Sequence, residues 1–180
     1  MDFEKSPTKT IELNLSKLGW MSLWLTIGSS IVLLAIFGLL HNGLVVHFTF
    51  MGVIRFIVGY ILLIIFHEFF HLIGFRLFGN IKWKEMDVGV NLKMGIAYAT
   101  TAKPIRNKGM KMALLLPFWM TGVLPAIIGF IIGSPGLIFL SAWLIGGAAG
   151  DFAMYKELRK IPNDAWIRDD PQKPKLYVFE

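Results

Sequence analysis

The sequence lacks cysteine entirely, which excludes both a disulfide framework and a zinc–thiolate site. It is also poor in charge: only 17 % of its 180 residues are Asp, Glu, Lys or Arg, and only four are histidine. Hydrophobic residues make up 55 % of the chain, and the mean hydropathy is +0.60. A chain this apolar is not expected to be a soluble domain, and its length suggests a single domain.

Charged residues are missing from long stretches of the chain. Residues 18–40 carry no charge, and residues 56–75 are interrupted only by one polar motif. Residues 112–155 contain a single charge, Asp151, and they divide at the turn signal Gly133-Ser134-Pro135-Gly136. The sequence therefore predicts an all-α membrane protein with one membrane-embedded domain, 1–180. Four transmembrane helices are expected at about 18–40, 52–77, 111–133 and 137–158. The first is not expected to be a signal peptide, because no small-residue cleavage site follows it.

Basic residues are unevenly distributed in this chain, whose net charge is +6. Seventeen of the eighteen lie in three regions. These are the N-terminal segment, the predicted loop 78–110 with the bordering Arg76 and Lys111, and the predicted tail 159–180 with the bordering Lys156. The exception is Arg55. The positive-inside rule places both termini and the middle loop of this multi-pass protein in the cytoplasm. The distribution favours membrane lipids, and not nucleic acid, as the partner of the positive charge.

The second apolar stretch contains the motif His67-Glu68-Phe69-Phe70-His71. Two histidines four residues apart lie on one face of a helix and can bind the same zinc ion, and the glutamate beside them can activate a water there. Ionisable side chains are costly in hydrocarbon, so three of them within five residues need an explanation. A polar cluster that hydrogen-bonds neighbouring helices is the alternative interpretation.

A catalytic zinc site usually has three protein ligands and one open position. Of the twelve acidic residues, only Glu68 and Asp151 lie in the apolar part of a predicted span, since Glu157 stands at the charged end of the fourth. His41 and His47 fall near the external loop. The motif centre is expected about 10 Å beneath the cytoplasmic end of its helix, and Asp151 about 7–8 Å beneath the same end. Small residues at 146–150 allow helices to approach closely there. Asp151 is therefore the candidate third ligand, with a helix-packing aspartate as the alternative.

The predicted loop 78–110 contains alternating apolar and polar residues from Met86 to Met94 and a second candidate strand at 96–101. A period of two predicts strands, and Met94-Gly95 marks a turn. We therefore expect a small β-hairpin in the cytoplasmic middle loop, whose edge is a candidate receiver for an extended substrate segment. The expected substrate-binding residues are Val88, Val90, Asn91 and Leu92. A surface hairpin held to anionic lipid by its basic residues is the alternative.

These elements together resemble the site-2 protease superfamily, whose members are membrane-embedded zinc proteases with His-Glu-x-x-His on one transmembrane helix and an aspartate ligand on a later one. Residues 60–180 are similar to small bacterial membrane proteins called putative zincin peptidases. The matching elements are His67-Glu68-x-x-His71, Lys103-Pro104, Pro117 and Gly146-Gly147-Ala148-Ala149-Gly150-Asp151. The resemblance implies a protein of the bacterial cell membrane. Unlike site-2 proteases, this chain has Phe152 directly after Asp151, and it contains no PDZ domain.

The sequence thus predicts an intramembrane zinc metalloprotease with one Zn²⁺ per chain, which hydrolyses peptide bonds of membrane-associated or membrane-proximal substrates. His67, His71 and Asp151 are the expected zinc ligands. Glu68 is the expected catalytic base that activates a water at the zinc ion. The alternatives are a metal-binding membrane protein without catalysis and a divalent-metal transporter. Transporters often contain internal repeats, and none is apparent in this sequence.

Overall fold

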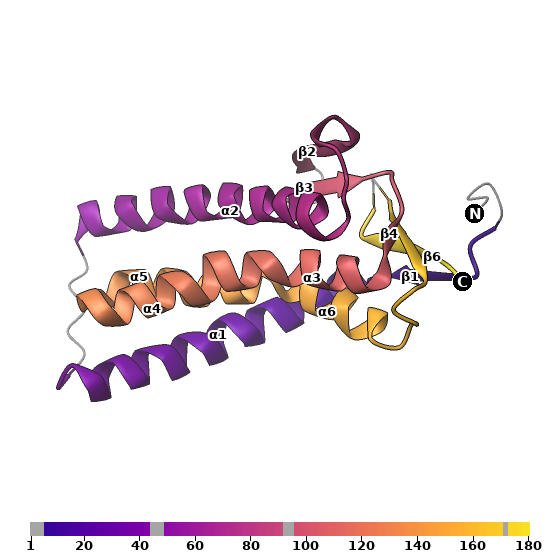
Figure 1. Ribbon diagram of the computed structural model, residues 1–180. Coiled ribbons are helices and arrows are strands. Elements are labelled where there is room, and N and C mark those ends of the chain that lie inside the picture. Colours follow the sequence, from indigo (N-terminus) through magenta and orange to yellow (C-terminus); the bar gives the residue numbers. More distant parts are fainter. Residues whose placement is uncertain (1–5, 44–48, 92–95, 171–172) are drawn as a thin grey trace. The chain divides into compact units, whose positions relative to one another are not determined.

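The computed structural model describes residues 6–43, 49–91, 96–170 and 173–180, which are mostly helical (Figure 1). The chain forms two compact units. The first comprises Met1–Leu15, Glu68–Leu116 and Gly150–Glu180, and the second comprises Ser16–His67 and Pro117–Ala149. Helix α2 (Phe50–Phe78) belongs to both, because the division falls between His67 and Glu68 within this continuous helix.

The second unit consists of helices. It contains α1 (Leu15–Leu40), the first part of α2, a π-helical segment (Phe118–Val123), α4 (Leu124–Ile132) and α5 (Pro135–Gly147). Helices α1 and α5 approach closely at Gly146, where an added Cβ would overlap Thr26. The hydroxyl of Ser22 donates to the Gly146 carbonyl at 2.9 Å, and that of Ser29 donates to the Ala142 carbonyl at 3.0 Å. Small residues and hydroxyl groups are the usual means of helix packing in an apolar medium.

The predicted turn at 133–136 separates α4 from α5. Gly133 ends α4 with φ of 65°, in the left-handed region that glycine adopts without strain. Ser134 caps α5, and its hydroxyl accepts a hydrogen bond from the Leu137 backbone N–H at 3.3 Å. Pro135 then begins the helix, at a position where no backbone N–H is needed.

Several helices are suitable for crossing a membrane. Within the described residues, three are long and apolar enough: Leu15–Leu40, Phe50–Phe78 and Asn107–Ile132. The fourth predicted span is instead a pair of shorter helices, α5 and α6 (Ala149–Leu158), which meet at a bend of 43°. Three or four helical spans are therefore available, depending on whether the bent pair counts as one.

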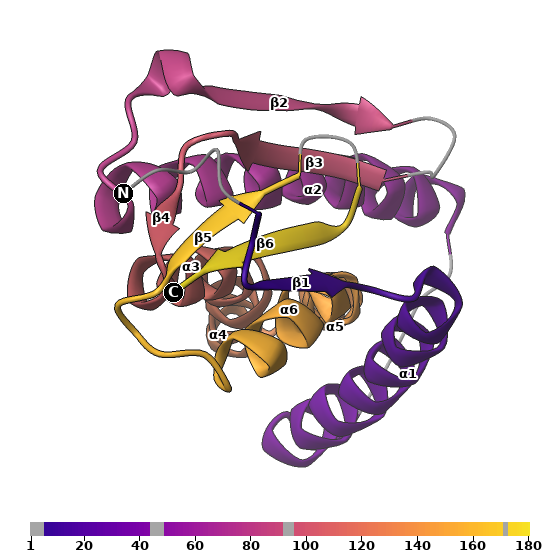
Figure 2. The same cartoon turned by 90° about the vertical axis from the view of Figure 1, so that its right-hand side faces the viewer.

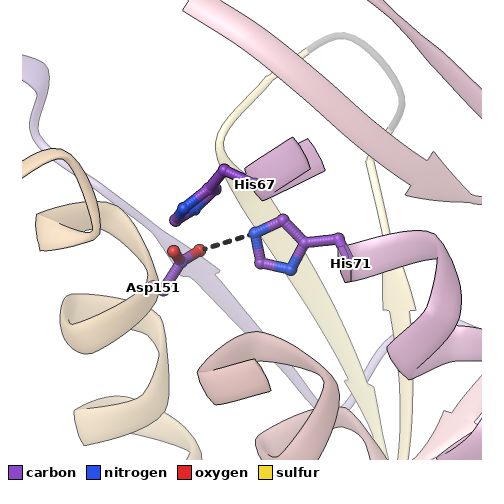
Figure 3. A group of neighbouring side chains, drawn as sticks. All are labelled: His67, His71 and Asp151. Atoms are coloured by element: carbon purple, nitrogen blue, oxygen red, sulfur yellow. Dashed lines mark ion pairs between the residues drawn. The ribbon is translucent and has the colours of Figure 1, made fainter. Parts of the chain in front are cut away.

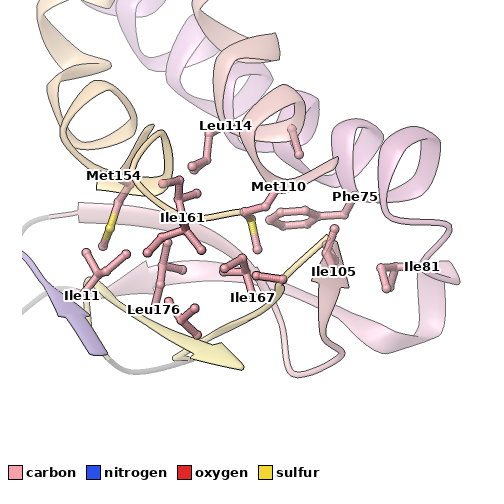
Figure 4. Close-up of a cluster of buried hydrophobic side chains, with 14 residues drawn as sticks. Ile11, Phe75, Ile81, Ile105, Met110, Leu114, Met154, Ile161, Ile167 and Leu176 are labelled. Atoms are coloured by element: carbon pink, nitrogen blue, oxygen red, sulfur yellow. The ribbon is translucent and has the colours of Figure 1, made fainter. Parts of the chain in front are cut away.

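The first unit contains a four-stranded antiparallel sheet with the order β1-β6-β5-β4 (Figure 2). Its strands are β1 (Lys9–Glu12), β4 (Ile105–Arg106), β5 (Trp166–Asp169) and β6 (Lys175–Phe179). The sheet's apolar side chains meet those of α2, α6 and α3 (Asn107–Pro117) in one buried cluster, which includes Ile11, Phe75, Met110, Met154 and Ile167 (Figure 4). Because β1 pairs with β6, the strands nearest the two ends of the chain are neighbours.

Asn107 ties the beginning of α3 to the end of α6 within the first unit. Its side-chain Nδ2 lies 3.0, 2.8 and 2.9 Å from the carbonyl oxygens of Leu158, Ile161 and Pro162, which share its two N–H hydrogens. Asn107 is fully buried, and its amide nitrogen finds its acceptors in the last residue of α6 and in the turn that follows it. The helix that carries Asp151 is thereby anchored to α3.

A separate two-stranded sheet is formed by β2 (Met86–Asn91) and β3 (Ile96–Thr101). The strands are antiparallel, and Val88 pairs with Ala99. The predicted hairpin strands are therefore present, preceded by a short 3₁₀ helix (Trp83–Glu85). Leu92 and the predicted turn at 94–95 lie outside the described residues. The helical content agrees with the predicted fold class, whereas the four-stranded sheet was not part of that prediction.

Candidate metal centre

His67 and His71 lie one turn apart on α2 and point toward the same place (Figure 3). Both side chains are buried, with His67 8 % and His71 6 % exposed. The i, i+4 spacing places them on one helix face. Buried imidazoles need polar partners, because an unbonded polar group in an apolar surrounding is costly.

Asp151 lies in the first turn of α6, directly after the bend at Ala148. Its Oδ1 is 3.3 Å from the Nε2 of His71 (Figure 3). One ligand atom from each of His67, His71 and Asp151 lies within 4.8 Å of the other two. The structure thus brings together the three side chains that the sequence analysis named as ligands.

His71 is oriented by a contact between α2 and α3. An added Cβ on Gly74 would lie only 2.7 Å from Ala113 Cα, so the helices touch here through backbone atoms. This close approach lets His71 Nδ1 donate to the Ala113 carbonyl oxygen at 3.2 Å. The ring's other nitrogen, Nε2, consequently faces Asp151.

His67 is oriented within the second unit by Thr121 of the π-helical segment. The Nδ1 of His67 is 3.2 Å from the Thr121 hydroxyl oxygen, and that hydroxyl donates to the Pro117 carbonyl at 2.8 Å. Thr121 is only 1 % exposed. Both histidines therefore use Nδ1 for a buried protein partner.

The donor set fits a zinc ion. Zinc binds imidazole nitrogen and carboxylate oxygen at about 2.0–2.2 Å, so two ligand atoms of a tetrahedral site lie about 3.3–3.5 Å apart. The 3.3 Å between His71 Nε2 and Asp151 Oδ1 matches this spacing. Two imidazoles and one carboxylate are also the ligand types of catalytic zinc sites, which keep the fourth position open.

The other predicted site residues lie near this group or on the hairpin. Glu68 is half-buried and follows His67 directly on α2. Val88 and Val90 are 53 % and 64 % exposed on β2, and Asn91 at the strand's end is half-buried. His41, which the sequence analysis set aside as a ligand, instead has its Nε2 3.1 Å from the Phe130 carbonyl oxygen.

The sequence analysis missed Asp169, a half-buried acidic residue on β5. Asp169 accepts a hydrogen bond from the Thr100 hydroxyl of β3 at 2.7 Å, which joins the two sheets of the first unit. Burial raises the pKa of Asp169 to about 7, against the smaller lowering effects of the hydrogen bonds from the Thr100 hydroxyl and the Asp170 backbone N–H. The tail sequence contained no pattern that pointed to this group, because its burial depends on pairing with distant strands.

Thr121 and the Ala113 carbonyl were missed as well. A threonine inside an apolar span and a backbone carbonyl have no distinctive sequence signature. The one available signal was Pro117, because a proline within a helix leaves a carbonyl four residues earlier without its usual donor.

Comparison with known proteins gives a match to the family of putative zincin peptidases over residues 60–166. The chain belongs to this family. No curated protein and no solved structure matches it. Zincin peptidases are zinc metallopeptidases, and the matched range contains the complete donor group His67, His71 and Asp151. Membership in this family therefore agrees with the zinc chemistry of the donor set.

Proposed function

We propose that this zincin-family protein is an intramembrane zinc metallopeptidase that cleaves membrane-associated or membrane-proximal substrates. The observation that carries the proposal is the donor group of the buried His67 and His71 and the half-buried Asp151, whose ligand atoms lie within 4.8 Å of one another, together with Glu68, which directly follows His67 on α2. Metal binding alone does not need a glutamate next to the first histidine, whereas peptide hydrolysis needs a base at this place.

The residues have distinct roles in this mechanism. His67 and His71 would hold zinc through Nε2, and Asp151 would hold it through a carboxylate oxygen. Bound zinc supplies Lewis-acid activation of water and of the scissile carbonyl. Glu68 accepts a proton from the attacking water, whose oxygen forms a bond to the carbonyl carbon. Glu68 then delivers that proton to the amine nitrogen as the C–N bond breaks.

Strand pairing in the first unit supports an even number of membrane crossings. Residues Lys9–Glu12 pair with Lys175–Val178 in adjacent strands, so both ends of the chain lie on one side. An odd number of spans would separate them, which supports counting the bent pair α5–α6 as one span. The concentration of basic residues at both ends and in the loop 78–110 supports a cytoplasmic location for that side. The membrane that we propose is the bacterial cell membrane, which follows from the family resemblance.

A cavity in the second unit supports a substrate that approaches within the membrane. It has a volume of about 550 Å³ and is lined by α1, α2 and α5, including Ser30, Tyr60, Phe139 and Trp143. Tyr60 precedes His67 by seven residues, so both lie on the same face of α2, about 10 Å apart along the helix. A peptide segment in this cavity would lie along the helix face that leads to the zinc ligands.

The hairpin supports binding of the substrate as an added strand. Strand β2 pairs with β3 alone among the described strands, and its exposed Val88 and Val90 lie on one face. Trp83, just before β2, stacks on Phe69 of the motif helix, with ring centroids 6.5 Å apart. An extended segment paired with β2 would gain backbone hydrogen bonds beside the helix that carries Glu68. Asn91, at the end of β2, extends the proposed contact, and Leu92 is proposed with it from the sequence alone, since it lies outside the described residues.

The experiment compares wild type with Glu68→Gln in lipid nanodiscs loaded with zinc, using a panel of quenched fluorescent peptides tethered to the lipid. We expect Glu68→Gln to keep its zinc and to lose cleavage by about 10²–10⁴-fold. Glu12→Gln, on the exposed face of β1, serves as the matched control. Full activity of Glu68→Gln would refute the mechanism. Zinc flux into vesicles without cleavage would identify a transporter, and bound zinc without turnover of any peptide would identify a binding protein.

A further inference from the structure

Both candidate histidine ligands contact one short stretch of chain through their Nδ1 atoms. His71 Nδ1 lies 3.2 Å from the Ala113 carbonyl oxygen, and His67 Nδ1 lies 3.2 Å from the Thr121 hydroxyl. Pro117 stands midway between these partners, four residues after Ala113 and four before Thr121. All of these contacts are buried from solvent.

Pro117 explains why the Ala113 carbonyl is available to His71. In an α-helix the carbonyl of residue i accepts from the N–H of residue i+4, and proline has no N–H to donate to Ala113. A buried carbonyl without a donor is unfavourable, and His71 Nδ1 supplies the missing hydrogen bond. Because a carbonyl oxygen only accepts, the Nδ1 of His71 must carry a proton.

Thr121 imposes the same arrangement on His67. A threonine hydroxyl has one proton, and here it is donated to the Pro117 carbonyl at 2.8 Å. The hydroxyl oxygen can therefore only accept from His67, whose Nδ1 must be the donor. Thr121 lies in the π-helical segment Phe118–Val123 that directly follows Pro117, and single π turns are frequent at functional sites.

We propose that Pro117 and Thr121 are positioning residues of the metal centre, which together place a ring proton on Nδ1 of both histidines and thereby direct both Nε2 lone pairs to the metal. This inference rests on the proposed function and adds the residues that orient its ligands. The 3.3 Å from His71 Nε2 to Asp151 Oδ1 has the spacing that such an orientation requires. Partners of this kind typically change metal affinity by 10–100-fold.

Zinc affinity of the purified full-length chain, measured by competition with a chromophoric chelator, tests the proposal. We expect Thr121→Val to bind zinc about 10–100-fold more weakly, and Thr121→Ser to remain close to wild type because it restores the hydroxyl. Thr26→Val is the matched control, since Thr26 also bonds to the carbonyl four residues earlier in its helix but is not a partner of either histidine. Equal zinc affinity of Thr121→Val and wild type would overturn the proposal, as would an equal loss in Thr121→Ser and Thr121→Val.

The Pro117→Ala variant distinguishes a positioning role from a purely structural one, because zinc affinity and thermal stability should respond differently. Alanine supplies an N–H that competes with His71 for the Ala113 carbonyl, so we expect weaker zinc binding. The same change removes a proline from a helix, so the thermal stability of the zinc-free protein should be unchanged or higher. Unchanged zinc affinity of Pro117→Ala would contradict the role of this residue.

The nitrogen that binds zinc can be identified directly by ¹⁵N NMR of the zinc-loaded protein with labelled histidine. The expected result is a protonated Nδ1 and a zinc-bound Nε2 for both His67 and His71. Coordination through either Nδ1 would overturn the proposal. Absence of zinc binding by wild type would refute the proposed function itself, whereas zinc-loaded wild type with unaffected variants would refute only the positioning role.

Discussion

His71 Nε2 lies 3.3 Å from Asp151 Oδ1 while His71 Nδ1 donates to a backbone carbonyl. With its proton on Nδ1, a neutral imidazole presents a lone pair at Nε2, and a carboxylate oxygen also offers only lone pairs. Two such atoms attract each other only through a shared cation, which is either a proton or a metal ion. Zinc binding at this pair should therefore displace protons, and zinc affinity should weaken as the pH falls.

Replacing Asp151 tests whether the third ligand is correctly assigned. We expect Asp151→Ala to weaken zinc binding by more than about 100-fold, beyond the effect of losing an outer hydrogen-bond partner. Isothermal titration or chelator competition on purified protein would measure this. Asp164→Ala, at an exposed position after α6, should bind zinc like wild type. Unchanged affinity of Asp151→Ala would leave a site with only two protein ligands and remove Asp151 from it.

The contact between α2 and α3 predicts that Gly74 is needed for the metal centre. A Leu side chain at Gly74 would collide with Ala113, whose Cα lies 2.7 Å from the position of an added Cβ. Because backbone atoms cannot move away cheaply, α3 would be displaced and His71 would lose its carbonyl partner. We expect Gly74→Leu to lower zinc affinity about 10–100-fold. Gly28→Leu, on α1 with nothing within 4 Å, is the matched control, and equal affinities of the two variants would contradict the prediction.

The exposed face of β2 should affect substrate binding without affecting zinc. A carboxylate at Val90, which is 64 % exposed, would disfavour pairing with an apolar extended segment. Val90→Asp should therefore raise KM for the tethered peptides and keep the zinc content of wild type. Thr10→Asp places the same charge on β1, the edge strand of the other sheet, and should leave KM unchanged. An unaltered KM for Val90→Asp would remove β2 from the substrate site.

The raised pKa of Asp169 predicts a pH-dependent contribution to stability. Its value rises from 3.8 to about 7, mainly because burial penalises the charged carboxylate. Between these values the folded protein binds a proton that the unfolded chain has lost, so the free energy of unfolding contributed by Asp169 decreases as the pH rises through this range. Thermal unfolding of the zinc-free protein from pH 4 to 8 would measure this. Asp169→Asn should flatten the dependence, whereas a slope equal to that of wild type would refute it.

Several features were predictable because their physical signals are local. The spacing of His67 and His71 places them on one helix face whatever surrounds them. Long runs without charge predict the helices, and a glycine-proline cluster predicts the turn at Gly133. Alternation with period two predicts the strands of the β2–β3 hairpin. The prediction of Asp151 was less direct. It depended on the similar depths expected for Asp151 and the motif centre in the membrane, and on the exclusion of the other acidic residues.

The four-stranded sheet could not be predicted from such local sequence patterns. Its strands contain only two to five residues each, too few for a periodic pattern to stand out. Strand β1 pairs with β6 from the opposite end of the chain, and such pairing depends on tertiary packing. The raised pKa of Asp169 follows from this sheet and from the hydrogen bond with Thr100, so no local pattern predicted it.

The sequence by itself determined the apolar helices, the identity of the candidate ligands and the membership of a zincin family, because hydrophobicity and helical spacing are properties of neighbouring residues. Only the tertiary structure decided how the ligands are oriented. The Ala113 carbonyl becomes a partner of His71 because Pro117 supplies no N–H and because Gly74 lets two helices touch. Hydrogen bonds of this kind depend on atoms that meet only after packing, so their directions are set by the folded chain.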